Sequence, residues 1–202
     1  MASVLAGFRP VKHLTGAPYN GQFNRSMISA SDTQVTNVGD LVVLSGDAAL
    51  VDTAGFGVYP AVERAASATA SQVIGVVVGF EPDYSNLNTG AYRAASTRRV
   101  AFVADSPDLI FAVPQDGTGG VVAAASVGLN CDIVVGTGAS TAPYASTQMI
   151  DSSQVATTST LPVQIVGVVA SPENDVTSTS RPAELLVRIN THAFGGAGVA
   201  GV

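Results

Sequence analysis

Residues 40–46, DLVVLSG, and residues 132–138, DIVVGTG, lie 92 positions apart and share four identities. A second pair, QVIGVVV at 72–78 and QIVGVVA at 164–170, has the same spacing. Two matches in one register predict a β-rich unit of about 90 residues that occurs twice in the chain. Chance similarity of composition is the alternative, because Val and Gly are common in strands and turns.

The composition favours an all-β protein, a barrel or sandwich built from two similar halves with an extended N-terminal arm. Ala, Val, Gly, Ser and Thr dominate, Trp is absent, and 12% of the residues are charged. β-Branched residues suit strands, and Gly, Asp, Asn and Pro mark closely spaced turns. The expected strands are residues 34–38, 40–45, 73–80, 99–104, 109–113, 121–125, 132–135, 164–170 and 184–190.

The two matched pairs also divide the chain. We expect an extended basic arm at 1–31, a body at 32–194 and a flexible Gly/Ala tail at 195–202. Within the body, the repeat predicts halves at 32–123 and 124–194. Each half then carries a long excursion, at 47–71 and 139–163, and the Ala-rich stretch 60–71 in the first is read as a short helix or a surface loop.

Valines inside the apolar runs are the expected core, and two glycines are expected bends. We predict that Val42, Val76, Val134, Val168 and Val187 are buried. Gly75 and Gly167 occupy equivalent places in the repeat, where a strand bulge would need a residue without a side chain.

The arm is expected to carry the function. It has no hydrophobic period and is interrupted by Pro and Gly, so it would order on assembly, with a disordered tail as the alternative. Its basic residues and the absence of acids give +3, against −9 for residues 32–202, which indicates electrostatic docking on a neighbouring copy or a larger partner. The candidate contact residues are three aromatic anchors and three basic residues: Phe8, Tyr19 and Phe23, with Arg9, Lys12 and Arg25. Deleting residues 1–25 is expected to leave the body folded.

No sequence pattern supports an enzyme, a cofactor or a metal site. The chain has no G-x-S-x-G elbow, no P-loop and no EF-hand pattern. His13 and His192 lie far apart, and we read His192 as a hydrogen-bonded structural residue. Cys131 is the single cysteine and is read as a small buried side chain. The turn 105–108, Asp-Ser-Pro-Asp, is read as a β-turn, and the eight arginines against one lysine as codon usage at most.

The composition also indicates which kinds of partner the protein binds. A chain with so little charge is expected to bury surface against other subunits. No apolar stretch is long enough to span a membrane, no basic cluster indicates nucleic acid, and no secretory signal is recognisable, so synthesis in the cytoplasm is expected.

Two segments resemble tailed-bacteriophage head decoration (capsid cement) proteins. These are residues 99–111, RVAFVADSPDLIF, and the closing residues 186–192, LVRINTH. In that family a valine-rich strand leads through Asp-x-Pro to an aliphatic–aromatic strand, and the chain ends on Ile-Asn-x-His. The resemblance covers most of residues 32–194.

The resemblance implies a non-enzymatic β module on the outer surface of the virion. It would bind the expanded capsid and bridge major capsid protein subunits, as a homo-oligomer with a trimer slightly favoured over a dimer. A phage tail or fibre component, or a bacterial surface adhesin, is one alternative. A carbohydrate-binding module, which would display exposed aromatic residues on one face, is the weaker one.

Overall fold

The computed structural model describes a chain that is nearly all β. It covers residues 7–47, 50–51, 57–65, 72–83, 86–118, 122, 124–172, 174, 183–195, 198 and 201. The expectation of an all-β fold with a barrel is confirmed. In the described part of the chain, neither 3-10 helix approaches the length and apolar character needed to cross a membrane.

The strands are short and follow one another closely. In chain order they are β1 Arg9–His13, β2 Asn24–Ile28, β3 Thr36–Asn37, β4 Leu41–Leu44, β5 Leu50–Val51, β6 Val58–Tyr59, β7 Ala61–Arg64, β8 Val73–Phe80, β9 Tyr92–Arg93, β10 Arg99–Ala104, β11 Leu109–Pro114, β12 Asn130–Val135, β13 Gln148–Ala156, β14 Val163–Val168 and β15 Glu184–Ile189. The 3-10 helices are η1 Leu87–Thr89 and η2 Ala124–Ser126.

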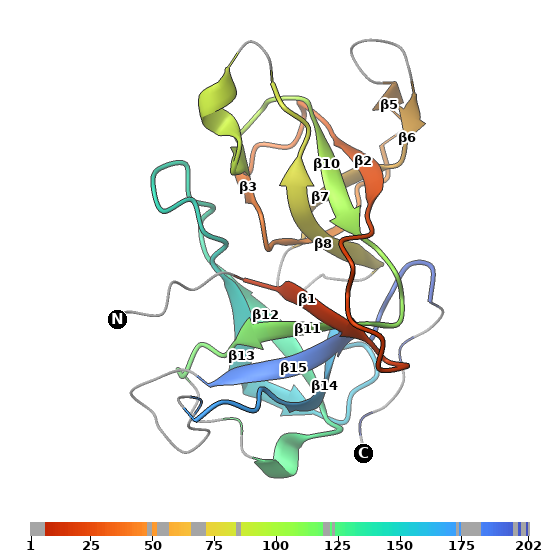
Figure 1. Ribbon diagram of the computed structural model, residues 1–202, viewed down its shortest axis with the longest axis vertical. Helices are drawn as coiled ribbons and strands as arrows, with labels where there is room; N and C mark the ends of the chain where they lie inside the picture. The colour runs from red at the N-terminus through yellow and green to blue at the C-terminus, as the bar shows by residue number, and fades with distance from the viewer. Residues whose placement is uncertain are drawn as a thin grey trace.

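Two lobes are visible in Figure 1. The upper lobe is a closed barrel with the strand order β10-β2-β7-β4-β8. The lower lobe is a sheet with the order β1-β11-β15-β14-β12-β13. This lower sheet curls until β13, its last strand, approaches the end of β11, since Gln115 and Ile150 form a parallel bridge and the Asp116 N–H donates to the Ile150 carbonyl at 2.9 Å.

The pairing pattern of the barrel is repeated in the lower lobe. In the barrel, β4 pairs antiparallel with β7 and β8, β8 and β2 both pair with β10, and β2 meets β7 in parallel. In the lower lobe, β12 pairs with β13 and β14, β14 and β11 both pair with β15, and β11 meets β13 through the parallel bridge. The two similar halves are therefore real, but they meet at the turn 105–108 between β10 and β11, and not at residue 123.

Both repeat-equivalent glycines lie beside a β-bulge. The register of β8 against β4 skips one residue before Gly75, and that of β14 against β15 skips one before Gly167. The surroundings differ, however. A Cβ on Gly75 would lie 2.3 Å from the backbone oxygen of Ala104, whereas a Cβ on Gly167 would meet only the Leu186 side chain, at 3.7 Å.

Alanine at these two glycines should therefore have unequal effects. We expect Gly75→Ala to lower the free energy of unfolding by about 1–3 kcal/mol, because backbone atoms of the neighbouring strand must move. Gly167→Ala should change it by less than about 1 kcal/mol, since the contact it makes is ordinary. Urea unfolding of both variants measures the difference, and equal effects would contradict the close approach at Gly75.

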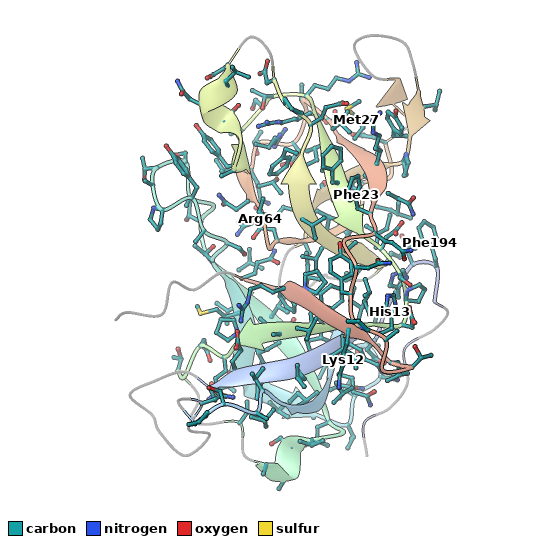
Figure 2. All side chains as sticks on the ribbon, viewed as in Figure 1. Lys12, His13, Phe23, Met27, Arg64 and Phe194 are labelled. Atoms are coloured by element: carbon teal, nitrogen blue, oxygen red, sulfur yellow. The ribbon has the colours of Figure 1, made fainter. Side chains whose placement is uncertain are left out.

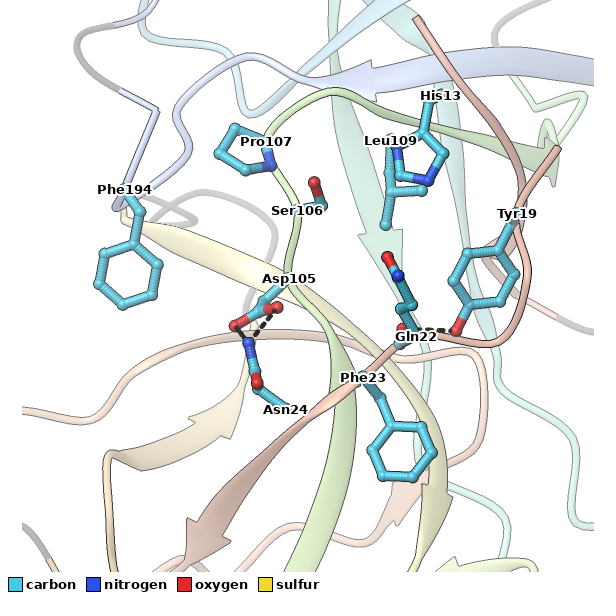
Figure 3. Close-up of a pocket in the computed structure, with 10 residues that line it drawn as sticks. All are labelled: His13, Tyr19, Gln22, Phe23, Asn24, Asp105, Ser106, Pro107, Leu109 and Phe194. Atoms are coloured by element: carbon cyan, nitrogen blue, oxygen red, sulfur yellow. Dashed lines mark hydrogen bonds between the residues drawn. The ribbon is translucent and has the colours of Figure 1, made fainter. Parts of the chain in front are cut away.

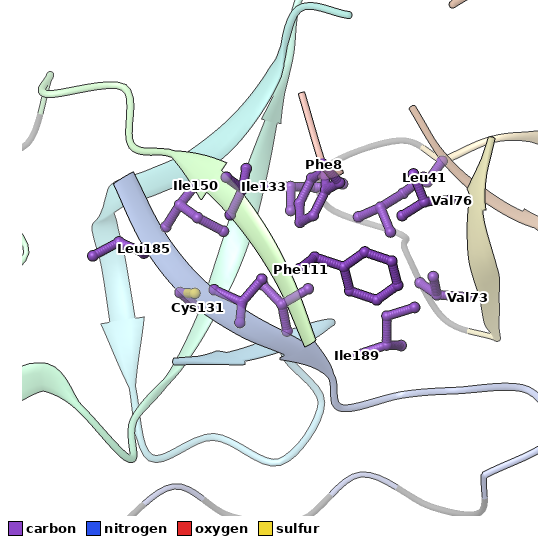
Figure 4. Close-up of a cluster of buried hydrophobic side chains, with 14 of the residues drawn as sticks. Phe8, Leu41, Val73, Val76, Phe111, Cys131, Ile133, Ile150, Leu185 and Ile189 are labelled. Atoms are coloured by element: carbon purple, nitrogen blue, oxygen red, sulfur yellow. The ribbon is translucent and has the colours of Figure 1, made fainter. Parts of the chain in front are cut away.

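The hydrophobic core has two parts. The smaller part fills the barrel and contains Ile28, Val42, Val62, Ile74, Val77, Phe80, Ala101 and Val103. The larger part fills the lower lobe and continues onto the outer face of β4 and β8, where Leu41 and Val76 pack against Phe8 and Phe111 (Figure 4). Strands β4 and β8 are thus buried on both faces, which explains their unbroken apolar sequence.

The predicted core is correct for Val42, Val76 and Val187, which are buried, and wrong for Val134 and Val168, which are only partly buried. β12 and β14 bury one face only, and Val134 lies on the other face; Val168 follows the bulge before Gly167 and packs against the core, but is not fully covered. In those strands, alternate residues such as Ile133 and Ile165 point into the core.

The N-terminal segment is extended, but it is not an arm separate from the body. β1 pairs with β11, and β2 closes the barrel between β10 and β7. The boundary at residue 31 is therefore wrong, and so is the expectation that the body folds without residues 1–25, because that deletion removes β1 and part of β2. The segment has no hydrophobic period because each strand presents a different, short apolar surface to the rest of the fold.

The long excursions also contain regular structure. β7 lies where a helix or loop was expected, and the second excursion contains β13. β7 pairs with β4 in the first half, and β13 pairs with β12 in the second. β5 and β6 pair with each other within the first excursion. The helix prediction for 60–71 is wrong for residues 61–64, and residues 66–71 lie outside the described ranges.

A buried polar network joins the lobes. The Arg64 guanidinium pairs with the Asp40 carboxylate at 2.8 Å and donates to the carbonyl of Gly136 at 2.8 Å. The Ser146 hydroxyl and the backbone N–H of Asn37 also donate to Asp40. Burial raises the pKa of the Asp40 carboxyl, and Arg64, Asn37 and Ser146 oppose that rise. Through these contacts the β12–β13 connection, which rises beside the barrel in Figure 1, is fixed to β4 and β7.

The residues after β15 return to the barrel, where His192 bridges to Val73 of β8 and the Ala193 N–H donates to the Val73 carbonyl at 2.8 Å. His192 is buried, its Nδ1 accepts the Phe194 N–H at 3.0 Å, and burial lowers its pKa, consistent with a structural role. Of the expected tail at 195–202, residues 195, 198 and 201 are described, and the Gly201 N–H donates to the carbonyl of Thr157 at 3.0 Å.

Candidate interaction site

A pocket of about 540 Å³ opens beside the turn that joins the two halves (Figure 3). Three parts of the chain supply its walls. They are the segment from the end of β1 to the start of β2, the turn between β10 and β11, and Phe194, which follows β15. The lining residues are His13, Tyr19, Gln22, Phe23 and Asn24, then Asp105, Ser106, Pro107 and Leu109, and finally Phe194.

Exposed aromatic and aliphatic side chains surround this pocket. Phe23 is 47% exposed and is held by stacking on Phe102, with 4.5 Å between ring centroids. Phe194 is 60% exposed, and Figure 2 places it close to Phe23 and His13 along the same side of the molecule. Tyr19 is partly buried, which raises its pKa, and its hydroxyl donates to the carbonyl of Gln22 at 2.9 Å. These rings form an apolar wall on the outside of a packed protein.

Asp105 is the carboxylate that lines the pocket, and Asp108 lies beside the pocket on the same turn. The Asn24 side-chain amide donates to both oxygens of Asp105 at 3.0 Å. The Ser106 hydroxyl donates to Asp108 at 2.5 Å, and His13 Nδ1 lies 3.0 Å from the other Asp108 oxygen. The hydrogen bond from Ser106 and then the one from His13 hold the pKa of Asp108 below its usual value. Asp108 is therefore an anion at neutral pH.

The geometry of Ser106, Asp108 and His13 is not that of a nucleophilic triad. In a triad the histidine lies between the hydroxyl and the acid, so that it can take the hydroxyl proton. Here Asp108 lies between Ser106 and His13. Within the described ranges, His, Cys, Asp and Glu side chains form no group of three that could hold a metal ion. What this arrangement offers is an anionic surface bordered by aromatic rings.

The structure separates the six predicted contact residues. Tyr19 and Phe23 come together in the pocket. Phe8 is 1% exposed and belongs to the core, so no partner can reach it. Arg9 pairs with Glu184 and Arg25 with Glu81, so both basic residues meet acids of their own chain. Lys12 lies on β1, outside the pocket, where its backbone bridges to Pro18.

Several pocket residues were missed by sequence reasoning. The turn at 105–108 was recognised, but its two carboxylates point to a site only because β1 and β2 bring His13 and Asn24 beside them. Phe194 follows the structural His192 and carries no signal of its own. The segment between β1 and β2, rich in Pro and Gly, was the one usable indication, since such connections often carry contacts.

No protein-family model matches the chain, and neither a curated protein nor a solved structure matches it.

Proposed function

We propose that this chain is a capsid decoration protein, which binds the outside of an assembled and expanded bacteriophage shell and bridges major capsid subunits. The resemblance of residues 99–111 and 186–192 to that family supports the proposal. The two segments are neighbours in the fold, because β11 pairs with β15 and Phe111 lies opposite Val187. The first segment also supplies the turn that lines the pocket.

The observation that carries the proposal is the group of exposed apolar side chains at the junction of the lobes. Phe23, Phe194 and Leu14, which is 56% exposed, lie at or near one pocket. The Leu14 N–H donates to the carbonyl of Asp108, which holds this residue beside the β10–β11 turn. Large apolar side chains grouped on a soluble surface are typical of a contact with another macromolecule. A low charge content on the whole chain fits the same interpretation.

The mechanism is mass action on the assembled shell. A protein that binds the expanded shell but not free capsid subunits stabilises the shell by RT ln(1 + [L]/Kd) per site, about 2.7 kcal/mol when its concentration is 100 times Kd. Repetition over the lattice adds these contributions. The protein would act on the virion surface as a homo-oligomer, with a trimer slightly favoured.

A second candidate function is carbohydrate binding. The exposed rings of Phe23 and Phe194 beside Asn24 and Asp105 favour it, because sugars bind through aromatic faces and polar side chains together. A tail or fibre component, or a surface adhesin, would use the same surface at another place.

Sedimentation with phage shells tests the proposed function. The purified protein is mixed with expanded and unexpanded shells of the phage whose genome carries the gene. We expect saturable binding to expanded shells, little binding to unexpanded ones, and a higher rupture temperature for decorated shells. Absence of binding to either form contradicts the proposal, and localisation on the tail by electron cryomicroscopy would select the tail alternative.

A further inference from the structure

We propose that the pocket at the junction of the lobes binds an arginine side chain presented by the partner protein. The inference rests on the proposed function only in taking the partner to be a protein. It names the chemistry that the pocket recognises: a guanidinium against Asp105, the carboxylate that lines the pocket, with its aliphatic stem and planar face on the aromatic wall.

The negative charge of the pocket favours a positively charged ligand. Asp105 and Asp108 lie three residues apart on one turn. Among the described residues, the side chains that contact these carboxylates are Asn24 at Asp105, and Ser106 and His13 at Asp108. Among the ion pairs of the described residues, none joins an Arg or Lys to either carboxylate. A guanidinium would supply charge-assisted hydrogen bonds to oxygens whose present partners are mostly neutral.

The walls favour arginine over other cations. Arginine stacks its flat guanidinium on aromatic rings and carries a long aliphatic stem, whereas the ammonium of lysine is compact and strongly hydrated. Phe23 offers one such ring, already fixed by stacking on Phe102, so that little side-chain freedom is lost on binding. Phe194 and Tyr19 offer two more surfaces (Figure 3).

The size of the pocket agrees with one side chain and its neighbours. A volume of about 540 Å³ lies in the range of small-ligand sites and exceeds what a single arginine fills. The remaining space borders Phe194, and the exposed Leu14 is held nearby by its hydrogen bond to the Asp108 carbonyl, which suits an apolar residue next to the arginine. The net charge of −6 on the chain would also speed the approach of a basic segment.

Titration with N-acetyl-arginine amide, followed by the backbone amide signals in an NMR spectrum, tests the inference. N-acetyl-citrulline amide has the same shape without the charge, N-acetyl-lysine amide has a different cation, and methyl glucoside represents a sugar. We expect saturable shifts at Asn24, Asp105 and Ser106 with the arginine compound. Citrulline should bind about tenfold more weakly, since charged hydrogen bonds are roughly twice as strong as neutral ones, and lysine should be intermediate.

Substitutions in the pocket test whether the arginine compound binds there. Asp105→Asn should weaken the arginine compound by about tenfold, and Phe23→Ala by a few-fold. Asp47→Asn is the matched control, because Asp47 is also exposed and accepts a hydrogen bond from Ser31 but lies outside the pocket. Melting curves show whether each variant is folded. The comparison of arginine with citrulline on the unmodified protein does not depend on any variant.

Three results would overturn the inference: equal binding of citrulline and arginine, unchanged affinity in a folded Asp105→Asn variant, or saturable binding of the glucoside in place of arginine. The last would favour carbohydrate binding. Sedimentation with shells separates this inference from the proposed function. Decoration of shells by a protein whose pocket ignores arginine would refute the site alone, and arginine binding without decoration would refute the function alone.

Discussion

Replacing Arg64 by methionine should lower the free energy of unfolding by about 3–5 kcal/mol, because it leaves the carboxylate of Asp40 buried without a cation. Both side chains are almost fully buried, at 2% and 0% exposure. Arg64 also donates to the Gly136 carbonyl and to the Thr147 hydroxyl at 3.0 Å, so two hydrogen bonds between the lobes are lost as well. Urea unfolding of the isolated protein measures the effect.

The same variant should show a characteristic pH dependence. Without Arg64 the strongest influence opposing the raised pKa of Asp40 is gone, so the pKa rises further. The folded variant then binds a proton more tightly than the unfolded chain does, and its stability must increase as the pH falls. The deficit relative to the unmodified protein should therefore shrink as the pH falls from neutrality towards about 4, the pKa of Asp in the unfolded chain.

Arg25→Met is the matched control for Arg64→Met. Arg25 pairs with Glu81 at 3.2 Å, but both side chains are well exposed, at 46% and 34%. Exposed ion pairs contribute at most about 1 kcal/mol, so this variant should unfold close to the unmodified protein. Similar losses in the two arginine variants would contradict the role assigned to the buried network.

Replacing Phe8 by alanine should lower the free energy of unfolding by about 3–5 kcal/mol, the cost of a large cavity in a core. Phe8 packs in the larger cluster beside Leu41 and Phe111, and its N–H donates to the carbonyl of Gly39 at 2.8 Å. The loss should appear in the isolated protein, because the cavity forms whether or not a partner is bound. Urea unfolding again provides the measurement.

Phe23→Ala gives the opposite expectation and serves as its control. Phe23 is half-exposed and stacks on Phe102, so its loss should cost no more than about 1.5 kcal/mol. It should instead weaken binding to the partner, because Phe23 lines the pocket. If Phe8→Ala leaves the stability unchanged, the N-terminal segment is separable from the body after all.

The sequence predicted most strands correctly where an apolar run stood between turns. The expected strand at 121–125 is wrong for residues 124 and 125, which belong to the 3-10 helix η2, and residues 121 and 123 lie outside the described ranges. Residues 73–80 and 99–104 form β8 and β10 with the bounds expected. The turn at 105–108 and the repeated order of Asp-led and Gln-led strands were also readable, because both depend on residues close together in the chain. Repetition of the pairing pattern then followed from the 92-residue spacing.

Strands with polar or interrupted sequences could not be predicted from the sequence. β1 is RPVKH, β2 is NRSMI and β7 is AVER. Each is a strand because of its neighbours: β2 completes the barrel, and β7 is held between β2 and β4 with Arg64 paired to Asp40. Local propensity carries no record of such contacts.

The arginines show the same limit. Arg93 is fully buried and donates to the carbonyls of Ser29, Asp32, Gln34 and Thr97. Arg99 donates to those of Glu81, Thr89 and Tyr92. The excess of arginine over lysine, read as codon usage, thus has a structural use, because the guanidinium presents several donors in a fixed plane.

By itself, the sequence determined the all-β class, the duplication and most of the apolar strands, since alternation, turn chemistry and repeats are local patterns. Only the tertiary structure decided that Phe8 lies in the core, that Val134 and Val168 are only partly buried, and that His13, Asn24 and Asp105 share a pocket. Those outcomes depend on which faces of β4, β8, β12 and β14 are covered by strands distant in the chain. Burial and electrostatic pairing between distant residues are properties of the packed chain and leave no local trace.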